Sequence, residues 1–379
     1  MEQPQKAAPP HFGETRQKQA KKYAELRRYL SVADTVIGGV LLWLFIFSGF
    51  KEVADSLPGG PPLQAALYFL ILVIAYGIPT MPLRYYGHVL ARRYGLSTQN
   101  VGGWLKDLLK GAFLMLLLGA AAFAIIYWFI ESRPDIWWLL TWGLLIFISF
   151  IFTALAPIVI LPLFMNLKPL GDEPLKERLF KLADKAEVKI NGVYEADFSS
   201  RGTTSNAALM GIGGTKRVFL SDTLLKEYTP EEIEVIMAHE LGHERSRDIF
   251  RLFGMQALAL LGTFYLTALI YDAAVSAFDF VSIADPAALP LLALIAAILN
   301  IALTPLLFAY TRRRELAADD YALRLTKDKE SFVNMMTRIH DQNLDEADPP
   351  SWVERFFYDH PSYKRRIALA DSLPEDKGK

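Results

Sequence analysis

Residues 136–160 read IWWLLTWGLLIFISFIFTALAPIVI, a run without a single charged side chain. A helix needs ~20 predominantly apolar residues to cross the hydrocarbon core of a bilayer, so this run predicts a membrane span. The chain is 52% hydrophobic, and five further uncharged blocks lie at 35–50, 61–83, 111–130, 252–271 and 286–311. Together they predict a mainly α-helical, polytopic membrane protein with a bundle of about six transmembrane helices.

Two of these blocks have uncertain edges. Asp34 borders the first block, which is short, and the fourth continues uncharged to Leu167 and contains Pro157 and Pro162. Proline removes a helical hydrogen-bond donor, so these two residues predict either the exit from the membrane or a kink.

Basic residues predict the orientation of the spans. Residues 1–32 contain seven Lys or Arg and the 84–107 loop contains four, whereas the alternate loops contain at most one each. Cytoplasmic loops are the ones enriched in Lys and Arg. We therefore expect the N-terminal arm, the 84–107 loop and the polar regions 168–248 and 312–379 to be cytoplasmic.

Composition excludes several other classes of protein and site. The chain has no Cys, which rules out disulfides and thiolate ligands, and its formal net charge of −1 gives no sign of nucleic-acid binding. The polar N-terminus has no short apolar core with a cleavage site, so we expect no cleaved signal peptide.

The stretch His239-Glu240-Leu241-Gly242-His243 carries the chemistry. Positions i and i+4 share one face of a helix, so both imidazoles can bind one metal ion while Glu240 reaches a water beside it. This is the H-E-x-x-H pattern of zinc peptidases, in which the Glu is the general base. Thr229-Pro230-Glu231-Glu232 predicts the start of the helix that the pattern requires.

A catalytic zinc ion usually has three protein ligands, and the third remains open at this point. Glu315 and Asp319 lie one turn apart where the sixth apolar block ends. Glu315 could bind the metal while Asp319 accepts the N–H of a ligating His. An ordinary solvated charged face, with Arg312 to Arg314 and Asp320 nearby, is an equally good interpretation.

The predicted organisation is an interrupted catalytic domain on a membrane bundle. The sequence of residues 168–248 predicts a helix over 174–186 and strands near 192–198, 207–212 and 217–221, with a turn at 213–215. The helix with the H-E-x-x-H residues follows. The sequence after the sixth apolar block predicts helices over 311–326, 329–343 and 361–373, with an acidic loop at 345–351. The segments in order are an N-terminal arm (1–32), four spans with a cytoplasmic loop near 84–107 (33–167), the first catalytic part (168–248), two spans (249–311) and the second catalytic part (312–379).

An ordered set of motifs resembles the type I CAAX prenyl endopeptidases, a family of membrane-embedded zinc metalloproteases of the gluzincin type. The resemblance covers roughly residues 60–370 and is specific because the motifs follow in the family's order. The matching stretches are Arg84–Tyr86, Arg93–Gln99, Leu161–Phe164, Lys168–Leu170, Ser205–Gly211, Lys216–Leu225, His239–His243, Glu315–Asp319 and His360–Ser362.

The resemblance implies a role for each matching residue. His239, His243 and Glu315 match the ligands of one Zn²⁺ per chain, Glu240 the general base and Asp319 the carboxylate behind a ligand. Asn206 and Ala207 match the edge-strand pair that holds the substrate backbone. His360 and Arg366 match the element that donates hydrogen bonds to the oxyanion or substrate, with Arg365 as a competitor for that role.

The implied function is hydrolysis of peptide bonds near the cytoplasmic membrane face, C-terminal to a prenylated Cys. The expected partners are a peptide or protein substrate, prenylated or not, and the lipid bilayer. The expected location is the cell membrane in a prokaryote or an endoplasmic reticulum-type membrane in a eukaryote. The family's eukaryotic members resemble a seven-span barrel, whereas this chain has six predicted spans, which leaves the shape of any enclosed chamber open.

Two alternatives remain at this stage. A membrane quality-control protease of the heat-stress type shares the metal-binding pattern, but its relatives resemble four-span proteins. A membrane scaffold or translocon-clearing factor with a vestigial site is disfavoured because a competent residue fills every catalytic position. The sequence leaves the oligomeric state open.

Overall fold

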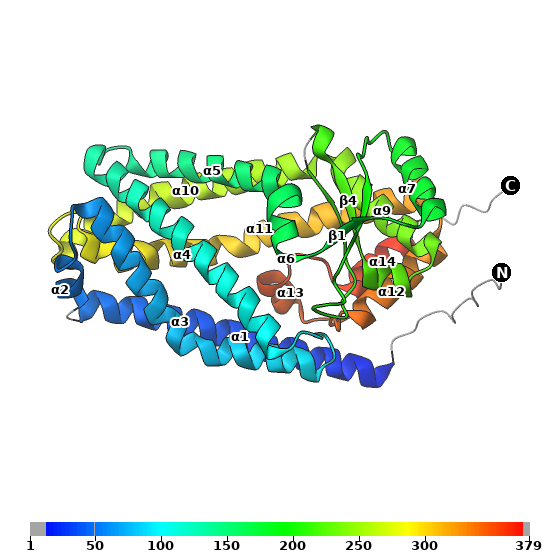
Figure 1. Ribbon diagram of the computed structural model, residues 1–379, viewed down its shortest axis with the longest axis horizontal. Coiled ribbons are helices and arrows are strands. Elements are labelled where there is room, and N and C mark those ends of the chain that lie inside the picture. Colours follow the sequence, from blue (N-terminus) through cyan, green and yellow to red (C-terminus); the bar gives the residue numbers. More distant parts are fainter. Residues whose placement is uncertain (1–12, 49, 212, 374–379) are drawn as a thin grey trace.

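The computed structural model describes residues 13–48, 50–211 and 213–373. Among them are six helices long and apolar enough to cross a membrane, which confirms the predicted number of spans (Figure 1). They are α1 (Glu14–Phe47), α3 (Pro61–Arg93), α4 (Val101–Ser132), α5 (Trp137–Leu155, which continues to Phe164), α10 (Asp248–Ala277) and α11 (Leu289–Thr326, preceded by a turn from Pro286). Residues 1–12 of the predicted arm and Ile212 of a predicted strand lie outside the described residues.

The fourth span is kinked at its prolines, one of the two outcomes that the sequence left open. After Leu155 the chain forms a π-helical turn, η1 (Ala156–Ile160), and then one more α-helical turn, α6 (Leu161–Phe164). Pro157 cannot donate to the preceding turn, and the hydrogen bonds widen until Leu161 donates to the carbonyl of Ala156.

The sixth span corrects a sequence-based prediction. We expected a span over 286–311 and a separate helix over 311–326, but α11 is one continuous helix with Pro305 inside it. No glycine or proline follows Pro305 before the helix ends, and Arg312 and Arg314 at the expected break have partners. Arg312 is buried and donates to the carbonyl oxygens of Glu354 and Tyr358 at 2.9 and 2.6 Å. The helix therefore extends directly from the span to Glu315.

The helix of the first span is also longer than expected, because it begins earlier in the chain. The predicted arm and the short first block form one helix, since α1 runs unbroken from Glu14 to Phe47. Its basic first half therefore projects along the catalytic end of the molecule, where α1 contacts α12 (Lys329–Gln342).

A four-stranded sheet has the order β1-β2-β4-β3. Strand β1 (Leu167–Pro169) is antiparallel to β2 (Val193–Ala196), β2 is parallel to β4 (Arg217–Ser221), and β3 (Ala207–Met210) is antiparallel to β4. The three predicted strands are thus present, β4 with the predicted bounds and β2 and β3 in shorter form. The turn between β3 and β4 is a 3₁₀ turn, η2 (Gly213–Thr215). Strand β1 was not predicted, because three residues ending in proline carry no periodic signal.

The sheet and the shorter helices gather at one end of the span bundle (Figure 1). Their core contains Leu179, Leu220, Ile233, Met237 and Phe332, all at most 2% exposed. The helices are α7 (Glu173–Lys185), α8 (Asp222–Glu227), α9 (Pro230–Arg245), α12, α13 (Ser351–Phe357) and α14 (Tyr363–Ser372).

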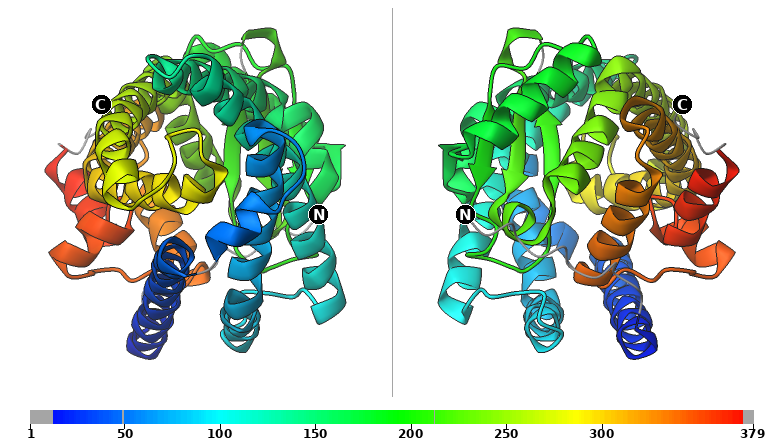
Figure 2. Two further views of the ribbon diagram at one scale, coloured as in Figure 1. Left: turned by 90° about the vertical axis from the view of Figure 1, so that its left-hand side faces the viewer. Right: turned by 90° about the vertical axis from the view of Figure 1, so that its right-hand side faces the viewer.

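A second core joins the spans at the opposite end. Helix α2 (Phe50–Asp55) and the turn η3 (Pro286–Ala288) pack there with the buried rings of Tyr68, Tyr127 and Tyr271. The spans themselves bury little, since only 6–22% of the most apolar stretch of each span is buried. Seen from either end, the spans are arranged around the long axis of the molecule (Figure 2).

Candidate active site

Helix α9 presents the H-E-x-x-H residues. A capping box begins the helix, since Thr229 accepts from the backbone of Glu232 and the Glu232 carboxylate accepts from the backbone of Thr229. Ile233, Met237 and Leu241 are buried against the core, which turns the opposite stripe with His239 and His243 towards α11.

Gly242 sets the distance between the two helices of the site. A Cβ atom at this position would lie 3.1 Å from a ring carbon of Tyr321 and 3.2 Å from the Cα of Ala318, both on α11. Helices approach this closely only where a side chain is missing, so Gly242 brings His243 within reach of Glu315.

We expect Gly242→Ala to destabilise the protein by about 1–3 kcal/mol and to weaken metal binding, because the new methyl group separates α9 from α11. Thermal unfolding in detergent and a metal titration would measure both effects. Gly254→Ala is the matched control, since nothing lies within 4 Å of a Cβ there. Equal stability and metal affinity of both variants would contradict this explanation.

Three donor groups converge between α9 and α11. One ligand atom each from His239, His243 and Glu315 lies within 4.8 Å of the other two. The two Nε2 atoms are 3.2 Å apart and lie 3.5 and 3.3 Å from the Glu315 carboxylate oxygens. Two imidazoles and a carboxylate on three sides of one point match the donor set of a catalytic zinc site.

Carboxylates orient both imidazoles. Nδ1 of His239 lies 2.9 Å from Asp319, and Nδ1 of His243 lies 3.0 Å from Asp248. With each Nδ1–H donating to a carboxylate, Nε2 is the ring nitrogen left on each His to bind a cation, which would replace the proton held there. Burial lowers the pKa of His239, but its hydrogen bonds to Asp319 and Glu315 outweigh burial and raise the pKa to about 10. The site thus attracts positive charge.

Arg366 supports Asp319 from behind. The guanidinium donates to both Asp319 oxygens, at 2.7 and 2.5 Å, and both side chains are at most 10% exposed. The competing Arg365 instead donates to Glu354 at 2.9 Å, and its side chain is half exposed. The structure thus brings Arg366, rather than Arg365, to the donor cluster.

The free edge of β3 faces Glu240. The backbone N–H of Leu209 donates to the Glu240 carboxylate at 3.3 Å, so this N–H points away from β4. Backbone groups alternate along a strand, and Ala207 therefore directs its own N–H and C=O to the same free edge. Asn206 and Ala207 line a cavity of about 700 Å³ together with His239, Glu240 and Glu315.

His360 lies next to Glu315 in the donor cluster. Its Nε2 is 3.4 Å from Glu315 and its Nδ1 is 2.8 Å from Asp359. The hydrogen bond with Asp359 raises the pKa of His360 above its usual value. His360 and Arg366 line the same cavity as Glu240.

Sequence reasoning missed two features of the site. Asp248 was not recognised because it reaches His243 only through a sharp break at Arg247, which is left-handed with φ of 53°. The Arg93–Gln99 motif was part of the family resemblance, but the sequence did not predict where it lies in the structure. It docks beside the site, where Ser97 pairs with Gly202 and Thr98 donates to the carbonyl of Ser199.

Family models match nearly the whole chain. Residues 2–166 match the model described as CAAX prenyl protease N-terminal, five membrane helices, and residues 169–373 match peptidase family M48. In the first stretch, the described part of this chain has four candidate spans, one fewer than that description.

Individual relatives and a solved structure agree with these models. The chain is 30% identical to the uncharacterized metalloprotease YhfN of Bacillus subtilis, over 93% of this chain and 84% of that protein. It is 27% identical to a CAAX prenyl protease 1 homolog of Arabidopsis thaliana, over 89% and 80% of the two chains. The crystal structure of S. mikatae Ste24p has the same fold, with a TM-score of 0.85 at 21% identity, covering 97% of this chain and 92% of that one.

Proposed function

The chain belongs to peptidase family M48, and we propose that it is a zinc-dependent endopeptidase that cleaves on the C-terminal side of a prenylated Cys. The family makes it a multi-pass membrane metalloprotease acting on peptides or proteins. The observation that carries the zinc proposal is the convergence of His239, His243 and Glu315 beside Glu240 in one cavity. The prenyl specificity rests on relatives that are named CAAX prenyl proteases.

The residues present fit one zinc ion per chain. His239 and His243 would hold it through Nε2 and Glu315 through its carboxylate, because Asp319 and Asp248 occupy the other ring nitrogens. A zinc ion bound there would supply Lewis acidity and would lower the pKa of a water molecule to ~7.

Glu240 is placed to act as the general base. Its carboxylate lies beside the donor cluster and at the free edge of β3, where a substrate backbone would pair. Glu240 would take the proton of the attacking water and return a proton to the leaving amine. Asn206 and Ala207 would hold the peptide backbone, and His360 would donate to the developing oxyanion.

For Arg366 we propose mainly a positioning role, in addition to the substrate contact that the resemblance implies. Because both of its hydrogen bonds to Asp319 are short and buried, it would act chiefly by holding Asp319 against His239. A direct contact between Arg366 and the oxyanion remains part of the proposal, since Arg366 also lines the cavity.

We place the catalytic end on the cytoplasmic side of the membrane. The basic first half of α1 and the 84–107 loop lie at the same end of the bundle as the sheet (Figure 1). Basic segments of this kind remain in the cytoplasm. A substrate anchored in the inner leaflet by a prenyl group would thus present its peptide near the cavity.

Removal of the metal is expected to abolish hydrolysis of a farnesylated CAAX peptide. Purified protein treated with a chelator should lose activity to background, and added Zn²⁺ should restore it, with about one zinc per chain by metal analysis. Hydrolysis that persists in metal-free protein would exclude the zinc proposal.

The same assay separates the candidate substrates. Preferred cleavage of the farnesylated peptide over its unlipidated counterpart supports the prenyl-protease proposal. Equal cleavage of both, together with cleavage of a misfolded membrane protein, would favour the quality-control alternative. Bound zinc without hydrolysis of any of these substrates would favour the scaffold alternative.

A further inference from the structure

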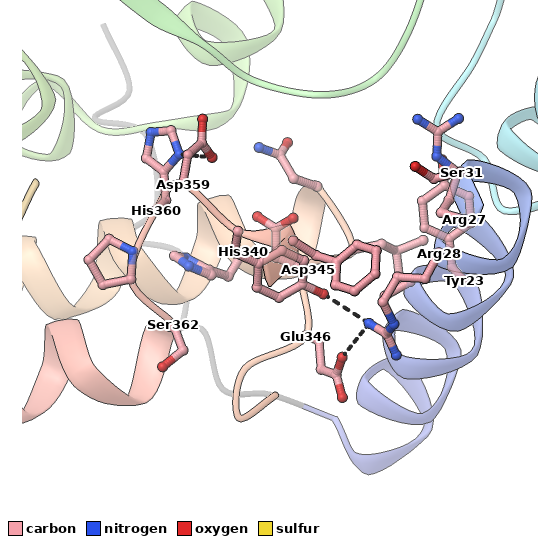
Figure 3. Close-up of a pocket in the computed structure, with 16 residues that line it drawn as sticks. Tyr23, Arg27, Arg28, Ser31, His340, Asp345, Glu346, Asp359, His360 and Ser362 are labelled. Atoms are coloured by element: carbon pink, nitrogen blue, oxygen red, sulfur yellow. Dashed lines mark hydrogen bonds and ion pairs between the residues drawn. The ribbon is translucent and has the colours of Figure 1, made fainter. Parts of the chain in front are cut away.

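The cavity of the active site continues beyond the metal donors. A second cavity of about 440 Å³ shares Tyr23, Arg27, His340, Asn343, Asp345 and His360 with the catalytic one. It lies between α1 and the loops on either side of α13, and in Figure 3 Arg27 and His360 stand on opposite sides with Asp345 between them. A ligand at the donor cluster can therefore extend towards α1.

Two neighbouring arginines of α1 face this region in different ways. Arg28 donates at 3.1 Å to both Glu346 and the hydroxyl of Tyr358, which fixes the loops against α1. Arg27 makes no hydrogen bond or ion pair with any described residue, yet it lines both cavities. Arg27 is exposed, and an unpaired guanidinium at the wall of a cavity is a binding group for a planar anion.

The other charges around the two cavities are mostly neutralised. Glu346 is paired with Arg28, Asp359 with His360, and Arg366 with Asp319. Asp345 has no ion-pair partner among the described residues, and burial raises its pKa to about 6. It disfavours a second carboxylate beside it, which leaves the Arg27 side of the cavity as the favourable place for an anion.

The edge strand indicates which part of a peptide enters this region. Asn206 and Ala207, but not Leu209 or Met210, line the cavity. A peptide that pairs with β3 in antiparallel fashion, as β4 does, runs from Met210 towards Ala207. Its C-terminal part then passes Asn206 and enters the space in front of Arg27. Three extended residues reach about 10 Å beyond the cleaved bond.

We propose that Arg27 binds the free C-terminal carboxylate of the substrate and thereby selects peptide bonds close to a chain end. This inference rests on the proposed function, because it assumes hydrolysis at the donor cluster. It explains why one of two adjacent arginines has no partner among the described residues while the other fixes the loops.

The test uses two farnesylated peptides, each with three residues after the modified Cys. One ends in a carboxylate and the other in an amide. We expect the full-length protein to cleave the carboxylate form with at least about tenfold higher kcat/KM, mostly through KM. Arg27→Gln should reduce cleavage of the carboxylate form to the level of the amide form and leave the amide form unchanged. Arg27→Lys should retain part of the preference.

Lys22→Gln is the matched control, because Lys22 is exposed on the same helix and lines neither cavity. A wild-type enzyme that cleaves both peptides equally would overturn the inference, as would an Arg27→Gln variant that slows both peptides to the same degree. If the wild-type protein with zinc cleaves neither peptide, the proposed function itself fails. Unchanged thermal stability of Arg27→Gln would show that its effect is on binding.

Discussion

Glu240→Gln is expected to lose peptide hydrolysis while it retains the metal. The amide cannot accept the proton of the attacking water, and general acid–base catalysis by one side chain contributes about 10²–10⁴-fold. Glu240 is not among the three convergent donors, so their arrangement should survive the change. A peptide cleavage assay combined with metal analysis of the purified variant measures both quantities.

The matched control for this prediction is Glu234→Gln. Glu234 lies on the same helix, forms a partly exposed ion pair with Arg178 and does not line the cavity. Its loss should change stability by less than about 1 kcal/mol and leave activity unaltered. An active Glu240→Gln enzyme would remove Glu240 from the mechanism, and loss of the metal would show that Glu240 has a structural role instead.

Asp319→Asn is expected to reduce both stability and metal affinity. Asp319 is fully buried, forms the ion pair with Arg366 and accepts from Nδ1 of His239. A buried charge left without its partner costs about 3–5 kcal/mol. Loss of the carboxylate behind a metal-binding histidine typically weakens metal binding about 10–100-fold. Chemical unfolding in detergent and a competition titration for Zn²⁺ provide the two readouts.

Asp320→Asn is the control for this second prediction. The neighbouring Asp320 pairs with Arg324 one turn along α11, and the side chain of Arg324 is 66% exposed. Surface pairs of this kind contribute about 0–1 kcal/mol, so the control should behave like the wild-type protein. If the two variants were equally stable and bound zinc equally, the buried pair of Asp319 and Arg366 would have no special importance.

The sequence predicted those features that depend on local patterns. Uncharged blocks located the spans because the bilayer demands ~20 apolar residues from each helix, independent of the neighbours. His239 and His243 were recognised because helical geometry alone places them on one face, with Glu240 next to them in the chain. The start of α9 at Thr229 was predicted for the same reason, since capping is a contact between residues three apart.

Other predictions failed where residues far away in the sequence provide partners for charged side chains that locally indicate the end of a helix. The cluster Arg312 to Arg314 indicated the end of the sixth span, but the chain has carbonyl and carboxylate partners for Arg312 and Arg314 from residues far away in sequence. The helix therefore continues to Thr326. In the same way, no local sequence pattern predicts the hydrogen bond between Asp248 and His243, because the left-handed residue Arg247 changes the direction of the chain between them.

The sequence by itself determined that this protein is a helical membrane protein with a metal-binding H-E-x-x-H helix, because length, polarity and i,i+4 spacing are local properties of the chain. Only the tertiary structure decided that Glu315 is buried beside His239 and His243 and not on a solvated charged face, because packing of α9 on α11 at Gly242 brings donors from both helices together. It also decided that Arg366 supports Asp319, and that Arg28 is paired while Arg27 faces the cavity. Which charge meets which partner depends on contacts between segments far apart along the chain, and no local pattern records those contacts.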